Sequence, residues 1–134
     1  MAEQVAFELV SPERILLSAS VDMVVVPGAD GDFAVLPGHA LFISSVRPGV
    51  IEVFNNDEVA ERIFVSGGFA EATAKRCIVL ADEAVPVDEL DREEIEAGIR
   101  DLHEDVADAP DEAEREKCLR RLAVAEAMLA ACSP

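Results

Sequence analysis

The sequence predicts a two-part fold, in which an all-β domain covers residues 1–87 and an antiparallel α-helical hairpin covers residues 88–134. Apolar residues alternate in the first part, which predicts strands, whereas they recur every three or four positions in the second, which predicts helices. Six of the seven Gly and five of the seven Pro also lie before residue 87. Because Gly and Pro favour turns, we expect many short connections in the first part and few in the second.

Five short runs in the first part show a period of two, which is typical of half-buried strands. Turn-forming residues separate these runs, and their spacing is typical of β-sandwiches and barrels, so we expect roughly eight to ten strands. The alternating residues, which we expect on the buried faces, are Val5, Phe7 and Leu9; Val21, Met23 and Val25; Val50 and Phe54 around Glu52; Ile63 and Val65; and Ile78 and Leu80.

The second part begins with an amphipathic helix, which we expect Asp88 to cap. Ala109 and Pro110 end this helix, and Asp111 with Glu114 three residues later resembles the capping box of a second one. A connection this short between two amphipathic helices predicts an antiparallel hairpin. The expected apolar stripes are Ile95, Ile99, Leu102 and Val106 on the first helix, and Leu119, Leu122, Ala125 and Leu129 on the second.

The composition excludes several classes of partner. The 134 residues include 28 Asp and Glu against 11 Lys and Arg, a formal net charge of −17, which argues against nucleic acid and anionic lipid headgroups. The hydrophobic fraction of 51% is high enough for a packed core, and the absence of Trp and Tyr leaves few groups on which bases or sugars could stack. Residues 88–134 carry 15 acidic and 6 basic residues, so about a third of the chain holds half of the net charge.

The sequence also bears on where the protein works. Its three cysteines are far apart, and the N-terminus lacks the basic and apolar segments of a signal peptide, which together favour a reducing compartment. The longest apolar run, residues 21–27, is interrupted by Asp22 and is much shorter than the ~20 residues of a membrane-spanning helix. We therefore expect a soluble or peripheral protein.

No pattern in the sequence indicates catalysis or a bound metal. His39 follows a turn and His103 lies on a charged helix face, and neither has a nucleophile at a characteristic spacing. Residues 30–32 begin like a calcium loop, but the later oxygen ligands are missing, so we expect a tight turn. Cys77 belongs to no CxxC pair and is expected to be buried, while residues 66–68 lack the lysine of a phosphate-binding loop. We expect the protein to act through its surfaces.

Five motifs, in this order along the sequence, carry a family resemblance: residues 10–14 (VSPER), 28–40 (GADGDFAVLPGHA), 47–50 (RPGV), 64–71 (FVSGGFAE) and 79–84 (VLADEA). They closely resemble the epsilon subunits of bacterial F-type ATP synthases, the counterparts of the mitochondrial delta subunit. The resemblance implies a β-sandwich of about ten strands followed by a helical hairpin. It also implies a non-catalytic rotor subunit of the central stalk, which couples proton-driven rotation of the c-ring to ATP synthesis.

The same resemblance implies the partners and the place of the protein. We expect contacts with the gamma subunit and the c-ring, and contacts of the hairpin with the alpha and beta subunits. The protein would then be peripheral on the cytoplasmic face of the bacterial inner membrane and would meet the membrane only through the complex. The residues implied at the c-ring interface are Asp30, Gly31, Asp32 and Phe33, and those at the gamma interface are Ser11, His39 and Ser44.

The hairpin raises two regulatory possibilities. Relatives that bind ATP carry an arginine where this protein has Glu94, so we expect no cofactor; if a nucleotide does bind, the residues implied are Leu90, Asp91 and Arg92. Contacts that inhibit ATP hydrolysis would use Arg115, Lys117, Arg120 and Arg121, although nearby acidic residues dilute this basic charge. The alternatives to a rotor subunit are a free-standing acidic binding or adaptor module and a weak ATP-sensing regulator.

Overall fold

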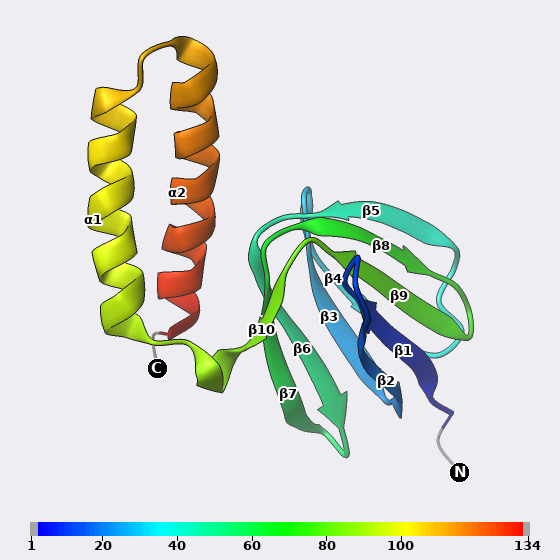
Figure 1. The fold of residues 1–134 in the computed structure, drawn as a ribbon. Helices are drawn as coiled ribbons and strands as arrows, with labels where there is room; N and C mark the ends of the chain where they lie inside the picture. The colour runs from blue at the N-terminus through cyan, green and yellow to red at the C-terminus, as the bar shows by residue number, and fades with distance from the viewer. Residues whose placement is uncertain (1–2, 133–134) are drawn as a thin grey trace. The chain divides into compact units, whose positions relative to one another are not determined.

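The computed structural model describes residues 3–132, which form ten strands, one short 3₁₀ turn and two helices (Figure 1). The polypeptide divides into two compact units between Pro86 and Val87. The first unit is all-β and the second is a helical hairpin, so the predicted fold class is confirmed. None of the helices in the described part of the protein is both long and apolar enough to span a membrane.

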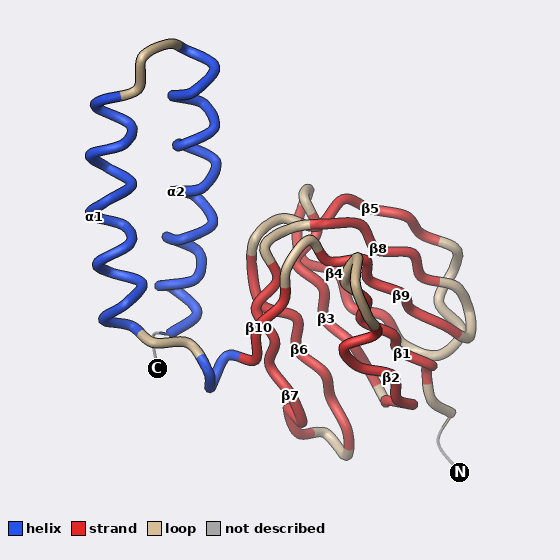
Figure 2. The backbone as a smooth tube through the Cα atoms, in the orientation of Figure 1, coloured by secondary structure: helices blue, strands red, loops and turns tan. Residues whose placement is uncertain are grey.

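The strands are β1 (Val5–Val10), β2 (Ile15–Val21), β3 (Met23–Gly28), β4 (Gly31–Val35), β5 (Phe42–Val46), β6 (Gly49–Asn55), β7 (Glu58–Val65), β8 (Gly68–Ala72), β9 (Arg76–Ala81) and β10 (Ala84–Pro86). A 3₁₀ turn (Val87–Glu89) follows, and the helices are α1 (Arg92–Asp108) and α2 (Glu112–Cys132) (Figure 2).

The strands are hydrogen-bonded in the order β10-β7-β6-β3-β5-β8-β9-β1-β2, with β4 added beside β3. Only the pair Gly28 and Val46 is in register between β3 and β5, so the sheet folds over at this point into two layers (Figure 1). One layer contains β10, β7, β6, β3 and β4, and the other contains β5, β8, β9, β1 and β2. β1 and β9 are parallel, and the other paired strands are antiparallel.

The core between the two layers consists mainly of small and branched apolar side chains, consistent with a sequence that contains six Phe and no Trp or Tyr. Phe7 is its one fully buried aromatic side chain among the described residues, and Phe33 packs at its margin. The core residues are Val5, Phe7, Leu9, Val21, Val24, Val26, Val35, Val46, Ile51, Val53, Ile63, Val65, Ala70, Ala72, Cys77, Val79 and Ala81.

The buried faces of β1 and β7 agree with the predicted alternation, but those of three other strands are shifted by one residue. The core contains Val24 and Val26 instead of Met23 and Val25, Ile51 and Val53 instead of Val50 and Phe54, and Val79 instead of Ile78 and Leu80. These strands have apolar residues on both faces, so that alternation by itself does not distinguish the buried face from the exposed one.

Asp22 accounts for the shift in β3, because it forms a corner between β2 and β3. Its backbone N–H donates to Phe54 O at 3.0 Å and to Asn55 Oδ1 at 3.1 Å, and its carboxylate accepts from the backbone N–H of Asn56 at 2.7 Å. The backbone therefore bends at Asp22, and the inward positions resume at Val24 rather than at Met23.

The helix starts differ in one respect from the prediction. Asp111 caps α2 as expected, since its Oδ1 accepts from the backbone N–H of Glu114 at 2.8 Å. The prediction that Asp88 caps α1 is wrong, because Asp88 lies in the 3₁₀ turn and Asp91 is the cap, with its Oδ1 accepting from the backbone N–H of Glu94 at 3.3 Å. Both acids precede a helical pattern, but only Asp91 has extended backbone directly before the first helical residue.

The two helices pack against each other along a narrow seam. The predicted stripe on α1 is half-buried throughout. On α2 the prediction of Leu119 is wrong, because Leu119 is 37% exposed and Cys118 is buried in its place. Cys118 lies four residues before the buried Leu122 and therefore one turn away from it on the same helix face, whereas Leu119 is rotated away.

Candidate functional site

An acidic turn, residues 29–32, joins β3 to β4 and contains three of the four residues predicted at the c-ring interface, and Phe33 follows it directly. Gly28 and Gly31 are paired across the hairpin, with residues 29–30 at its tip. Gly31 has φ +134, which side chains other than glycine rarely adopt, and a Cβ at Gly28 would lie 2.6 Å from the carbonyl oxygen of Gly31. Both glycines are therefore required for this tight turn.

Arg47 ties the acidic turn to the rest of the sandwich. Its Nη1 donates to Gly28 O at 2.6 Å, and its Nη2 donates to Asp32 Oδ1 at 2.5 Å. Oδ1 of Asp32 is thus paired with a cation of the protein itself. The side chains of Arg47 and Asp32 are 44% and 59% exposed, so solvent screens the pair and its worth to stability is about 0–1 kcal/mol.

Phe33 supports the turn from the inside. It is half-buried, packs against the core, and makes an edge-to-face contact with Phe42 at a centroid distance of 4.9 Å. Of the four residues predicted at the c-ring interface, Asp30, Gly31 and Asp32 are exposed and Phe33 is half-buried.

An apolar face covers the outside of the layer formed by β5, β8, β9, β1 and β2. Strand pairing aligns Phe69 with Leu80, Leu80 with Val10, and Val10 with Ile15 in one continuous row. Phe69, Leu80 and Ile15 are 60%, 54% and 61% exposed, and Ile43 on β5 is 66% exposed. An exposed row of large apolar side chains across several strands is typical of a surface that binds another protein.

Sequence reasoning missed this apolar face. Leu80 and Ile78 were expected to be buried, and Ile15, Ile43 and Phe69 were not singled out. The available clue was the presence of apolar residues on both faces of β9, where Cys77 and Val79 fill the core.

Among the residues that the structure describes, no hydrogen bond joins any two of the three residues predicted at the gamma interface. Ser11 follows Val10 of the apolar face, and its Oγ donates to Arg14 O at 3.3 Å. Ser44 lies on β5 beside Ile43, is half-buried, and donates to Ser45 O at 2.9 Å. His39 is in the loop before β5, with Nδ1 2.5 Å from Ala40 O. Ser11 and Ser44 therefore lie at opposite sides of the layer that carries the apolar face.

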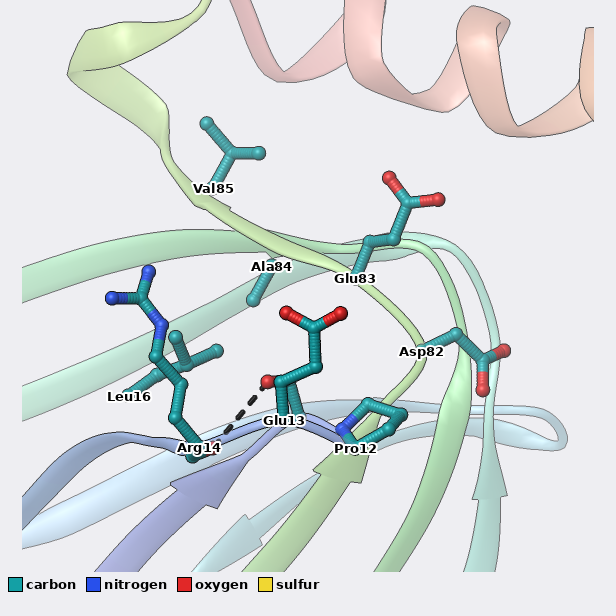
Figure 3. Close-up of a pocket in the computed structure, with 9 residues that line it drawn as sticks. Pro12, Glu13, Arg14, Leu16, Asp82, Glu83, Ala84 and Val85 are labelled. Carbon is teal, nitrogen blue, oxygen red and sulfur yellow. Dashed lines mark hydrogen bonds between the residues drawn. The ribbon is translucent and has the colours of Figure 1, made fainter.

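A shallow pocket of about 310 Å³ lies beside Ser11, where the loop between β1 and β2 meets the segment before β10 (Figure 3). Three carboxylates and the guanidinium of Arg14 surround it, so its polar groups are mostly acidic. The lining residues are Ser11, Pro12, Glu13, Arg14, Leu16, Asp82, Glu83, Ala84 and Val85.

The residues predicted to hold a nucleotide lie together where α1 begins, but their groups have local partners. Asp91 caps the helix, and Arg92 Nη1 lies 3.5 Å from Glu96 Oε1, one turn further along α1. The backbone N–H of Leu90 donates to Val87 O at 3.2 Å. The carboxylate and the guanidinium are thus used by the helix itself.

The four basic residues predicted to make inhibitory contacts are exposed on α2. Lys117, Arg120 and Arg121 are spaced by three and four positions and therefore lie on one side of the helix. Arg115 is two positions before Lys117, so it points to a different side, and its Nη1 lies 3.5 Å from Glu112 Oε1.

The cysteines are free thiols, and Cys77 is buried in the core as predicted. Burial raises the pKa of Cys77 to about 12, because the apolar core disfavours a thiolate. In the part of the protein that the structure describes, no three His, Cys, Asp or Glu side chains are placed to hold a metal ion.

The fold and its surfaces define a two-unit protein, a β-sandwich with an acidic turn and an apolar outer face, followed by a helical hairpin. Residues 4–87 match the family described as ATP synthase, Delta/Epsilon chain, beta-sandwich domain, and residues 91–133 match the C-terminal domain of the ATP synthase epsilon chain. Together these two matches span almost all of the sequence. The protein belongs to the ATP synthase epsilon chain family.

Individual relatives agree with this assignment. The sequence is 52% identical to the ATP synthase epsilon chain of Rhodospirillum rubrum, with 98% of each protein covered. It is also 52% identical to that of Rhodospirillum centenum, with 96% of this protein and 92% of the relative covered.

Solved structures share the fold. A subunit in the cryo-EM structure of the Euglena gracilis mitochondrial ATP synthase OSCP/F1/c-ring has a TM-score of 0.85 and 26% identity, with 97% of this protein and 82% of that subunit covered. A subunit in the cryo-EM structure of the Tetrahymena thermophila mitochondrial ATP synthase central stalk/c-ring has a TM-score of 0.63 and 13% identity, with 99% of this protein and 100% of that subunit covered. At this identity, the similarity concerns the fold alone.

Proposed function

We propose that this protein is a non-catalytic rotor subunit of the ATP synthase central stalk, which couples rotation of the c-ring to ATP synthesis through contacts with the gamma subunit and the c-ring. It would lie on the cytoplasmic face of the bacterial inner membrane as part of the complex. Its family and its similarity to a subunit of the Euglena mitochondrial enzyme support this role.

The observation that carries the proposal is the presence of two different contact surfaces on one rigid β-sandwich. The apolar face around Phe69, Leu80 and Ile15 suits a broad, stable interface with gamma. The acidic turn at residues 29–32 is small, polar and exposed, and suits a wet contact with the loops of the c-ring. A subunit that transmits rotation needs two such contacts on a body that does not deform, and the packed core of the sandwich provides that stiffness.

Purification of the assembled enzyme tests the proposal. We expect the tagged protein to bring down gamma, alpha and beta in comparable amounts from gently solubilised membranes. Elution of the tagged protein without these subunits would rule out the rotor assignment.

Variants on the apolar face locate the contact with gamma. We expect Leu80→Glu or Phe69→Glu to abolish recovery of gamma, because a buried unpaired carboxylate is costly in an interface. Val59→Glu is the matched control, since Val59 is also an exposed apolar residue, at 43%, but lies on β7 in the other layer. Equal loss of gamma with all three variants would argue against a specific role of this face.

A further inference from the structure

Strand β2 forms an open edge of the sandwich. It is the last strand of its layer and, among the strands that the structure describes, it pairs with β1 alone. Ala19 of β2 lies opposite the fully buried Phe7 and therefore on the inward side of the layer, yet it is exposed. The described part of the protein thus leaves this edge uncovered.

The pairing of β1 determines which backbone groups the edge presents. The N–H of Ala6 donates to the segment directly before β9, so the next residue, Phe7, directs its N–H and C=O toward β2, where it pairs with Ala19. Backbone groups alternate in the same way along β2. Because Ala19 directs its groups toward β1, the N–H and C=O groups of Ser18 and Ser20 point away from β1 and into the open edge.

β2 lacks the features that usually keep a sheet edge from pairing, which are charges, prolines, bulges and short length. β10 has three residues and ends in Pro86, and the part of β7 that β10 leaves free, residues 58–62, carries three charges. β2 has seven residues without a charge or a proline. Its shift in register lies at Leu16, before the regular pairing of residues 17–21. These residues can therefore pair with a further strand.

The apolar face reaches this edge. Its row of side chains runs from Phe69 to Ile15, which lies on β2 and is 61% exposed. The next residue of β2, Leu16, lines the shallow pocket described above, so the start of the strand borders open space (Figure 3). A partner that covers the apolar row can continue along β2 without displacing any described part of the protein.

We infer that β2 accepts an additional strand from the gamma subunit, an extended segment whose main chain pairs with Ser18 and Ser20 and whose outward side chains continue the apolar row past Ile15. This inference rests on the proposed function, because it makes the edge a continuation of the surface assigned there to gamma. A second copy of this protein is disfavoured as the occupant, since each copy carries a net charge of −17.

Hydrogen exchange of the full-length protein, alone and within purified ATP synthase, tests the pairing. In the free protein the amides of Ser18 and Ser20 should exchange faster than that of Ala19, which faces β1. In the enzyme we expect exchange of the two serine amides to slow by about tenfold or more, because a paired amide exchanges only when its strand opens. Unchanged exchange at both amides in the enzyme would overturn the inference.

A proline at the edge separates recognition of the main chain from recognition of the side chain. Ser18→Pro removes an outward N–H and keeps the bonds to β1, and we expect it to weaken binding to ATP synthase depleted of this subunit about tenfold, the effect of one lost hydrogen bond. Ser18→Ala is the matched control, which keeps the N–H, and its affinity should stay within about twofold. Equal affinities of the two variants would overturn the inference. Circular dichroism checks the fold of Ser18→Pro, and if it does not fold, hydrogen exchange decides.

The outcomes separate this inference from the proposed function. Loss of gamma with Leu80→Glu, together with unchanged exchange at Ser18 and Ser20, refutes the added strand and leaves the rotor assignment intact. Recovery of gamma that is insensitive to Leu80→Glu and Phe69→Glu refutes the gamma surface itself. Exchange at the serine amides that slows in the free protein as its concentration rises, with a doubled mass in solution, would identify a second copy as the occupant and overturn the assignment to gamma.

Discussion

The β-sandwich and the helical hairpin differ in how completely they bury their side chains. Most core residues of the sandwich, Phe7 and Leu9 among them, are inaccessible to solvent. In the hairpin, the structure describes all of α1 and none of its residues is buried. In α2, which is also described in full, the buried residues are Cys118, Leu122 and Ala131. Burial of apolar surface is the main source of stability, so the sandwich is the stiff part of the molecule and the hairpin is the part most easily remodelled.

A cavity in the core of the sandwich should be the most damaging change. Phe7→Ala should lower the free energy of unfolding of the sandwich by about 3–5 kcal/mol, because Phe7 is the largest fully buried side chain of its core. Urea denaturation followed by circular dichroism of the β-sheet measures it. A cost below about 1 kcal/mol would contradict the packing described for this core.

A cavity in the seam of the hairpin should cost less. Leu122→Ala is expected to lower stability by about 2 kcal/mol, at the low end for a leucine, because Leu122 remains 7% exposed and the narrow seam can close around the cavity. The helical signal at 222 nm reports on this unit. If the loss equals that of Phe7→Ala, the two units do not differ in packing as we describe.

Alkaline titration probes the burial of the sandwich core through Cys77. Burial raises the pKa of Cys77 to about 12. The unfolded protein therefore loses this proton at lower pH than the folded protein does, and stability should fall as the pH rises above the unfolded thiol pKa of about 8.5. The slope is about 1.4 kcal/mol per pH unit below the folded pKa. Cys77→Ala should remove this component, and an unchanged slope in that variant would refute the assignment.

A smaller effect again distinguishes the two candidate caps of α1. Asp91→Ala should destabilise the hairpin by about 1 kcal/mol, because it leaves the N–H of Glu94 without its acceptor. Asp88→Ala is the control and should change stability by less than about 0.5 kcal/mol. Thermal unfolding monitored by the helical signal compares them, and a larger effect of Asp88→Ala would restore the cap inferred from the sequence.

Much of the fold was predictable because it depends on local patterns. The change from a period of two to spacings of three and four located both kinds of structure, and Asp111 with Glu114 located the start of α2. The glycines at 28 and 31 likewise indicated the acidic turn before its geometry was known.

The candidate site was less predictable because its contacts join distant parts of the sequence. Nothing near Asp32 in sequence indicates that Arg47 holds it. The apolar row depends on the parallel pairing of β1 with β9, which sets Val10 beside Leu80. Its member Leu80 lies on β9, a strand that has apolar residues on both faces.

Local sequence patterns were enough to establish the two-unit organisation, the strand-rich and helix-rich composition of each unit, the tight acidic turn and the family. These follow from short-range periodicity, turn chemistry and ordered motifs. Three features required the folded molecule: which face of each strand is buried, which acid of the turn is paired, and where apolar side chains remain exposed. A strand with two apolar faces can bury either one, and the strands that pair with it make the choice.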